Sequence, residues 1–227
     1  MSARADIDGT GFALLHDVLS PELIERTLEE IERLAPHRGR AGVRHVLGLN
    51  PVAKIARCAQ LISVAREVLG KDAIPFRATL FEKTLAANWL VVWHQDTALP
   101  LRERQELQGW GPWSIKECIT YAHAPSTALS QVLALRIHFD DSTSANGPLR
   151  VLPGTHELGV LSDEQIHDLS KQVRPVDCLV PKGGVVAMRP LVVHASSKSQ
   201  VKMPRRVLHI EYAASDSIAA PLRLASA

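Results

Sequence analysis

The chain has 227 residues, of which 46% are hydrophobic and 22% are charged, and its formal net charge is +2. A chain of this length and composition is expected to form one globular domain over residues 1–227 that buries most of its apolar side chains. The charge is small and the basic residues are scattered, which disfavours a nucleic-acid binder and favours a small-molecule partner.

Three cysteines, Cys58, Cys118 and Cys178, are an odd number at wide spacings. They favour neither a disulfide framework nor a CxxC zinc site. Residues 1–10 contain no apolar leader, and no stretch is long and apolar enough to span a bilayer. We therefore expect a cytoplasmic protein that has no membrane partner.

The first part of the chain has helical spacing. Ser20-Pro21-Glu22 is typical of a helix start, with an N-cap, a proline in the first turn and an early acid. Apolar residues recur on one face from Leu23 to Leu34, and again over 52–69 up to Gly70. The pattern predicts a helical layer over about 20–70.

From residue 74 onward the pattern changes to short β-like runs. The predicted strands cover 75–83, 89–94, 132–139, 149–152, 173–180, 185–188, 191–194 and 206–212, and one helix is predicted over 162–171. Turns such as Asn146-Gly147-Pro148 separate the strands. We therefore predict a mainly β fold, a sandwich or jelly roll over about 74–214 with helices packed outside.

The connection over 97–127 is long for a compact domain. It contains Trp110 and Trp113, with glycines at Gly109 and Gly111. One hypothesis is an active-site lid, which would make both tryptophans candidates for substrate contact. The alternative is a structural excursion that packs its tryptophans on the sandwich.

The motif with the clearest chemistry is Trp93-His94-Gln95-Asp96. Side chains two apart on a strand share a face, so His94 and Asp96 can bind one ion while Gln95 faces away. His194 ends another apolar run and can supply a third ligand from a neighbouring strand. Two histidines and a carboxylate form the facial triad that binds non-haem Fe(II) and leaves positions open.

The same residues allow a plainer interpretation, a hydrogen-bonded polar pair without a metal. A second His-x-Asp motif occurs at His138 and Asp140, but it runs into a turn and lies too close in sequence to His194 to be separated from it by several strands. We therefore favour the first pair. Arg136 and His138 share a face, which either lines the substrate cavity or is an exposed polar face.

Arg205 and Arg206 begin the last apolar strand, where alternation allows only one of them to point inward. An inward guanidinium is suited to a carboxylate because its planar fork donates two parallel hydrogen bonds. Lys83 could add positive charge, and Ser196 lies on the side of His194 if that strand continues. The alternatives are a solvated surface for the basic residues and a turn or capping role for Ser196.

Taken in order, these residues resemble the phytanoyl-CoA dioxygenase family of Fe(II)/2-oxoglutarate oxygenases over most of the chain. The matching motifs are Asp8-Gly9 to Leu19, Phe81-Glu82-Lys83, Trp93-His94-Gln95-Asp96, Asn146-Gly147-Pro148-Leu149-Arg150-Val151-Leu152-Pro153-Gly154-Thr155-His156, and His194-Ala195-Ser196 followed by Arg205. The resemblance implies a double-stranded β-helix in which His94, Asp96 and His194 hold iron. It also implies that Arg205, at the family's distance from His194, pairs with the distal carboxylate of 2-oxoglutarate.

The activity that this resemblance implies is hydroxylation of a small organic metabolite, with O2 and 2-oxoglutarate consumed and succinate and CO2 released. Halogenation is disfavoured because halogenating relatives lack the carboxylate that Asp96 supplies. Two alternatives stay open, a jelly-roll hydrolase or isomerase that uses the metal without 2-oxoglutarate, and a non-catalytic ligand-binding jelly roll. The bulky acyl-CoA substrate of the founding member is not expected, since no obvious basic surface is left to hold a nucleotide.

Overall fold

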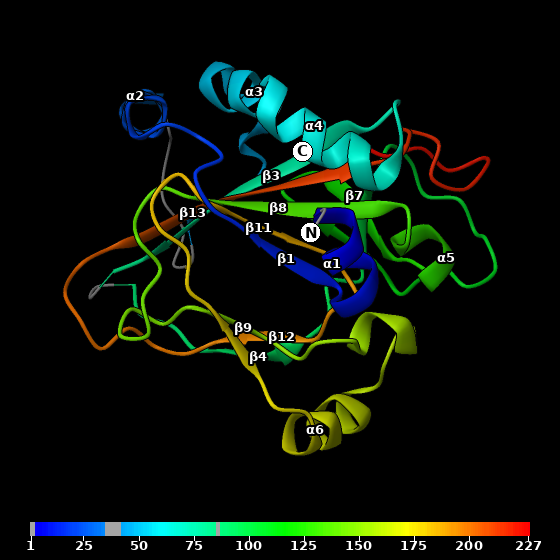
Figure 1. Cartoon of the computed structure of the whole chain (residues 1–227). Helices are drawn as coiled ribbons and strands as arrows, with labels where there is room; N and C mark the ends of the chain where they lie inside the picture. The colour runs from blue at the N-terminus through cyan, green and yellow to red at the C-terminus, as the bar shows by residue number, and fades with distance from the viewer. Residues whose placement is uncertain (1–2, 35–41, 85–86) are drawn as a thin grey trace.

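The protein is built around two antiparallel β-sheets that face each other, as the computed structural model shows (Figure 1). The structure describes residues 3–34, 42–84 and 87–227. The large sheet has the order β1-β11-β8-β13-β3-β2 and consists of β1 (Phe12–Leu15), β2 (Gly42–Val43), β3 (Ile74–Lys83), β8 (Val132–His138), β11 (Val185–Met188) and β13 (Arg205–Ala213). The small sheet has the order β10-β9-β12-β4 and consists of β4 (Val91–His94), β9 (Leu149–Val151), β10 (Val176–Cys178) and β12 (His194–Ser196).

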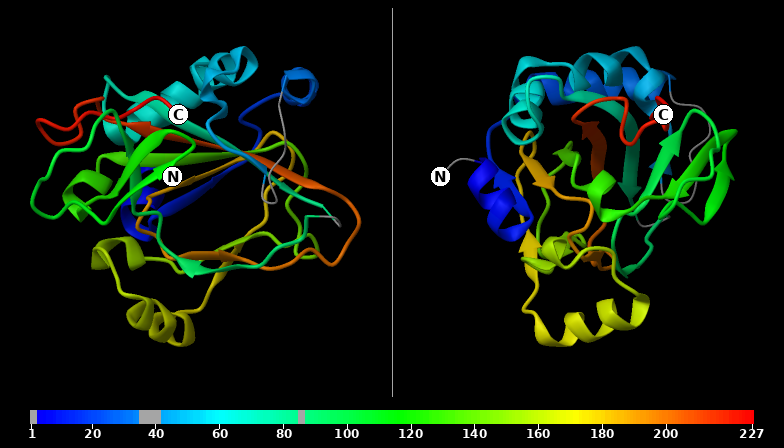
Figure 2. Two further views of the ribbon diagram at one scale, coloured as in Figure 1. Left: turned by 180° about the vertical axis from the view of Figure 1, so that it is seen from behind. Right: turned by 90° about the vertical axis from the view of Figure 1, so that its right-hand side faces the viewer.

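Helices cover the outer faces of this sandwich (Figure 2). Helices α3 (Asn50–Ala56) and α4 (Ala59–Leu69) lie over the large sheet, and α6 (Asp163–Gln172) lies outside the small sheet. Helices α1 (Ala3–Thr10) and α2 (Pro21–Leu34) contribute side chains to the core on the large-sheet side. The other described helices are short: η1 (Val46–Gly48), α5 (Ser126–Leu129) and η2 (Thr155–Leu158). This arrangement is the jelly roll with outer helices that the sequence predicts.

Strand alternation in the large sheet separates a helix-facing core from the interior between the sheets. Leu80 of β3, Leu135 of β8 and Leu208 of β13 belong to the main core cluster, together with Ile24 and Leu61 of the helices. The alternate residues of the same strands point to the opposite face. This face is the inner wall of the sandwich, and it carries the polar residues of the site described below.

The segment over 97–127, interpreted from sequence as a long connection, contains a three-stranded sheet instead. Its strands are β5 (Ala98–Leu101), β6 (Trp113–Lys116) and β7 (Ile119–His123), in the order β5-β7-β6. A two-residue turn with positive φ at Glu117 and Cys118 joins β6 to β7. Such turns favour Asn-Gly or Asp-Gly, so Glu-Cys gives no sequence signal. Trp110 is buried in a second core cluster, as the packing alternative expects.

All eight predicted strands have counterparts, with one shift. The run 191–194 is buried, but β12 begins only at His194, because Val192 closes a turn onto the carbonyl of Arg189. The predicted helix over 52–69 is two helices, α3 and α4. The hydroxyl of Tyr212 donates to the carbonyl of Ala56 at the end of α3, a contact that the local sequence does not indicate. Residues 35–41, inside the predicted helical layer, lie outside the described residues.

Within the described ranges, none of the helices combines the length and the apolar character needed to cross a bilayer. Cys58, Cys118 and Cys178 are free thiols.

Candidate metal centre and cosubstrate pocket

Three potential metal ligands meet where β4 and β12 pair. His94 ends β4 and lies directly opposite His194, the first residue of β12, and their ring centroids are 4.2 Å apart. Asp96 follows two residues later, with its carboxylate 3.7 Å from Nε2 of His94 and 3.5 Å from Nε2 of His194. One ligand atom from each residue lies within 4.8 Å of the others. The three side chains therefore fit a single metal ion.

Both histidines are held in the tautomer that a metal needs. Nδ1 of His94 is 2.8 Å from the carbonyl of Val92, and Nδ1 of His194 is 2.9 Å from the carbonyl of Val192. A carbonyl only accepts hydrogen bonds, so each Nδ1 carries the proton and each Nε2 keeps its lone pair. Backbone carbonyls commonly orient metal-binding histidines in this way.

The ionisation states also suit a cation. Burial alone would raise the pKa of Asp96, but nearby His194 and His94 more than offset this effect and lower it below the ordinary range. Burial lowers the pKa of His194 to about 4, although Asp96 acts in the opposite direction. At neutral pH the centre offers a carboxylate and a neutral imidazole, the forms that bind metal.

Gln95 points away from the triad, as strand alternation predicts. Its amide donates to the carbonyls of Gly159 and Leu191 and accepts from the N–H of Leu161. The second His-x-Asp motif does not form a metal site, because the Asp140 carboxylate accepts hydrogen bonds from the backbone and guanidinium of Arg206.

A cavity of about 120 Å³ extends from the triad along the inner wall of the large sheet. Its lining residues are Phe81, Lys83, Trp89, Val91, His94, Asp96, Arg136, Leu149, His194, Ser196 and Arg205. Lys83 and Arg205 converge on the Ser196 hydroxyl, at 2.7 Å from Nζ and 3.3 Å from Nη2. Two cations sharing one neutral hydroxyl create an anion site at this end of the cavity.

Burial disfavours the charged forms of both basic side chains at this anion site. It lowers the pKa of Lys83 to about 7, with Arg205 and Arg136 acting in the same direction. It lowers the pKa of Arg205 to about 10, again with help from Arg136. Lys83 also donates to the carbonyl of Ser197 and lies 5.5 Å from the centre of the Trp89 ring. An anion bound here would relieve the mutual repulsion of the two side chains.

Of the two adjacent arginines, Arg205 is the inward one. Its side chain is buried and its Nε donates to the carbonyl of Asn146. Arg206 faces outward and pairs with Asp140 and Glu32.

The candidate substrate residues separate into two groups. Arg136 lines the cavity together with the triad. His138 is buried on the same face of β8 with no hydrogen-bond partner for either ring nitrogen, and burial lowers its pKa to about 3. Trp110 is packed in the second core cluster and Trp113 lies against that cluster, and neither is among the lining residues. Their substrate roles stay predictions.

Sequence reasoning assigned no role to Phe81, which occurs only within a matching motif, or to Trp89, His209, Arg77 and Glu211. The first two line the cavity, and the others lie on the same inner face of the large sheet. Strand alternation provided a usable signal, because Phe81 is two residues from Lys83 and His209 is four residues from Arg205. Trp89 had no such signal, because alternation along the predicted strand 89–94 places it on the face opposite to His94.

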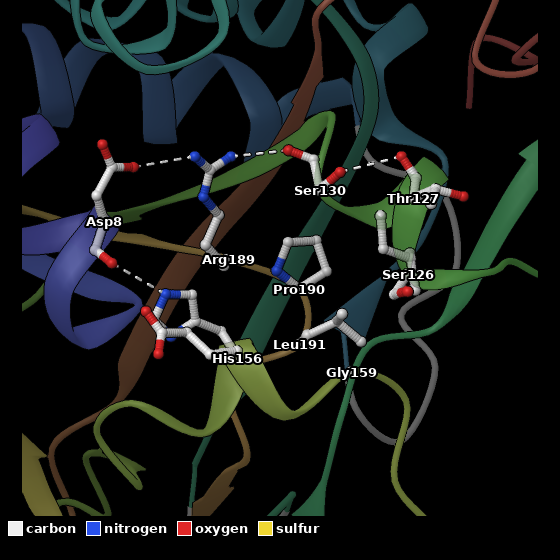
Figure 3. Close-up of a pocket in the computed structure, with 11 residues that line it drawn as sticks. Asp8, Ser126, Thr127, Ser130, His156, Gly159, Arg189, Pro190 and Leu191 are labelled. Carbon is white, nitrogen blue, oxygen red and sulfur yellow. Dashed lines mark hydrogen bonds and ion pairs between the residues drawn. The ribbon is translucent and has the colours of Figure 1, made fainter.

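A separate pocket of about 410 Å³ lies between α1, α5, η2 and the segment that precedes β12 (Figure 3). Gly159 and Leu191, the two residues that bond to Gln95, are part of its lining. Its polar groups already bond to one another: Arg189 bonds to Asp8 and to the carbonyl of Ser130, and His156 bonds to the carbonyl of Asp8. These contacts join α1 to neighbouring segments, and none of the three ligands lines the pocket.

Comparison with known proteins identifies the family. The model of the phytanoyl-CoA dioxygenase family (PhyH) matches residues 7–207. The chain belongs to the phytanoyl-CoA dioxygenase family. The sequence-based resemblance to this family is thereby confirmed.

Individual relatives are distant but match over most of their length. L-proline trans-4-hydroxylase of Streptomyces griseoviridis is 24% identical over 93% of this chain and 85% of that protein. Ectoine dioxygenase of Nocardia farcinica (strain IFM 10152) is 22% identical over 87% of this chain and 72% of that protein. The epimerase SnoN, solved with Fe3+, alpha-ketoglutarate and nogalamycin RO, superposes with a TM-score of 0.73 at 17% identity, covering 95% of this chain and 83% of SnoN.

These findings confirm the fold class, a double-stranded β-helix, and the class of enzyme, an Fe(II)- and 2-oxoglutarate-dependent dioxygenase. They favour the oxygenase over a metalloenzyme without cosubstrate and over a non-catalytic binding protein.

Proposed function

We propose that His94, Asp96 and His194 hold Fe(II) in this chain. The observation that carries the proposal is the convergence of their ligand atoms within 4.8 Å, with both imidazoles oriented through Nδ1. Three ligands leave the positions that O2 and a chelating cosubstrate require.

The same proposal places 2-oxoglutarate along the cavity, with its distal carboxylate at Arg205, Lys83 and Ser196. The anion site lies on the wall that also leads to the triad, so one molecule can reach both ends. The cavity has a volume of about 120 Å³.

The substrate in this proposal is a small organic metabolite that is hydroxylated at a C–H bond. Relatives named for L-proline and ectoine support a substrate of that size. When bound, iron and 2-oxoglutarate supply the oxidising chemistry, in which O2 is consumed and succinate and CO2 are released. The residues of the chain orient both partners and exclude water. A single domain and a cytoplasmic location remain part of the proposal.

The test is an anaerobic titration of the purified protein with Fe(II) and 2-oxoglutarate, which follows the visible charge-transfer band of the chelate. Wild type should show a band that requires both additions. Asp96→Ala should lose it. Arg205→Gln should need at least about thirtyfold more 2-oxoglutarate, because removing one partner of a buried charge pair costs about 2–5 kcal/mol.

Arg206→Gln is the matched control, since the neighbouring guanidinium faces outward. Its half-saturation for 2-oxoglutarate should stay within twofold of wild type. An equal loss in both arginine variants would contradict the assignment of Arg205, and metal binding without any band in wild type would contradict the cosubstrate itself. Mass spectrometry of turned-over substrate then distinguishes hydroxylation, which adds one oxygen atom, from desaturation or epimerisation.

A further inference from the structure

The inner wall of the large sheet carries three cross-strand pairs of polar side chains. They are Lys83 with Arg205, Arg136 with His209, and Arg77 with Glu211. Four of these six side chains are cations, and only Glu211 is an acid. Most of this wall is buried, so each cation needs a counter-charge to offset the loss of its hydration.

Two of the pairs have an evident counter-charge. The guanidinium of Arg77 forms an ion pair with the carboxylate of Glu211. Lys83 and Arg205 converge on Ser196, where the proposed function places the distal carboxylate of 2-oxoglutarate.

Arg136 has no counter-charge of this kind. Its side chain is 8% exposed, and Nη1 donates to Nδ1 of His209 at 3.0 Å. Within residues 3–34, 42–84 and 87–227, no carboxylate lies within ion-pair distance of it. His209 is neutral, because burial and the neighbouring Arg136 hold its pKa well below the ordinary value. The hydrogen bond that the guanidinium donates therefore goes to a neutral acceptor. Burial lowers the pKa of Arg136 and outweighs Asp96 and Glu211, which favour its charge from beyond ion-pair distance.

The position of Arg136 shows where a compensating anion would lie. Arg136 lines the same cavity as His94, Asp96 and His194, and it is one strand away from Arg205 on the shared wall. The ring of Phe81, which also lines the cavity, lies 5.4 Å from the guanidinium carbon. An anion held by Arg136 would therefore sit inside the cavity beside the candidate metal centre.

We infer that Arg136 binds a carboxylate of the primary substrate, so that the substrate class is a small carboxylic acid. The inference rests on the proposed function. In that proposal, Lys83 and Arg205 bind one carboxylate of 2-oxoglutarate. The charge of the second carboxylate is balanced at the metal, because Asp96 is the only anionic side chain among the three proposed Fe(II) ligands. The cosubstrate has no further carboxylate for Arg136. The planar fork of arginine is suited to hold a carboxylate in one orientation.

The test uses the anaerobic Fe(II)–2-oxoglutarate complex of wild type, Arg136→Gln and the outward-facing control Arg206→Gln. The probes are propionate and its uncharged isostere propionamide. The thermal unfolding midpoint is measured against probe concentration, because a ligand that binds the folded state raises it saturably. The charge-transfer band reports the half-saturation for 2-oxoglutarate in each protein.

Propionate should raise the midpoint of wild type and of Arg206→Gln saturably, and propionamide should not. Arg136→Gln should lose the propionate effect while its half-saturation for 2-oxoglutarate stays within twofold of wild type. The inference is overturned if propionate does not stabilise wild type, or if it stabilises Arg136→Gln equally. A loss of 2-oxoglutarate affinity of tenfold or more in Arg136→Gln would assign Arg136 to the cosubstrate instead.

Arg136→Met provides a second variant that keeps the length of the side chain without its charge. This variant should lose the propionate effect as Arg136→Gln does, and a propionate effect equal to that of wild type would overturn the inference. Failure of the proposed function is distinguishable, because wild type would then show no charge-transfer band.

Discussion

The affinity for 2-oxoglutarate should fall as the pH rises above 7, because Lys83 loses its charge. Burial, with Arg205 and Arg136 nearby, lowers the pKa of Lys83 to about 7 in the free protein. A carboxylate bound at Ser196 favours the charged form and brings the pKa back toward the ordinary value of about 10.4. Binding of 2-oxoglutarate therefore includes the uptake of a proton when the pH lies between these two values.

The size of the effect follows from this linkage. With a pKa of about 7, half of the Lys83 side chains are protonated at pH 7 and about one in a hundred at pH 9. The dissociation constant for 2-oxoglutarate should therefore increase about fiftyfold between these pH values. The sign is definite, because raising the pH removes the proton that binding requires.

The assay is the anaerobic charge-transfer titration repeated from pH 6 to pH 9. Lys83→Met should bind more weakly at pH 6 and lose most of the pH dependence, whereas Arg206→Gln should keep the wild-type slope. If Lys83→Met kept that slope, or if wild type showed none, another group would titrate and the reasoning from the buried lysine would be wrong.

Three further predictions concern the supports of the site. Asn146→Ala should lower the free energy of unfolding by about 1–3 kcal/mol, because the buried side chain of Asn146 accepts from the N–H of Thr143 and donates to the carbonyl of Asp141. Chemical denaturation measures this loss, and an unchanged unfolding midpoint would contradict it. Gly147→Ala should be destabilised by about 2–4 kcal/mol, because the φ of Gly147 is +68° and an added Cβ would lie 2.3 Å from the carbonyl oxygen of Ser197. A free energy of unfolding equal to that of wild type would refute this. Fe(II) and 2-oxoglutarate together, each at a hundredfold excess over its dissociation constant, should add at least about 2.7 kcal/mol to the stability of wild type. Asp96→Ala should show no such gain in stability when unfolding is followed by calorimetry. A gain equal to that of wild type would place the metal at other residues.

Local patterns predicted much of the candidate site. Alternation along one strand placed His94 and Asp96 on one side and Gln95 on the other, and the contacts of all three agree with that placement. The same rule required one of Arg205 and Arg206 to point inward. These features depend on the period of a strand, so they can be read without knowing the partners of the strand.

Other elements could not be read in this way. The sheet formed by β5, β7 and β6 was interpreted as a connection because its hairpin turn at Glu117 and Cys118 lacks the usual residues. The break between α3 and α4 coincides with a hydrogen bond from Tyr212, which is 156 residues away from Ala56 in the chain. Contacts of such separation leave no local pattern.

The sequence by itself determined the fold class, the candidate ligands and the family, because each depends on local periodicity or on a contiguous motif. Only the tertiary structure decided how the inner wall is charged. It brought Lys83 to Ser196 across 113 residues of chain and left Arg136 with the neutral His209, 73 residues away, as its partner. Electrostatic energies inside a protein depend on distance and burial, and both are set only when the sheets close on each other.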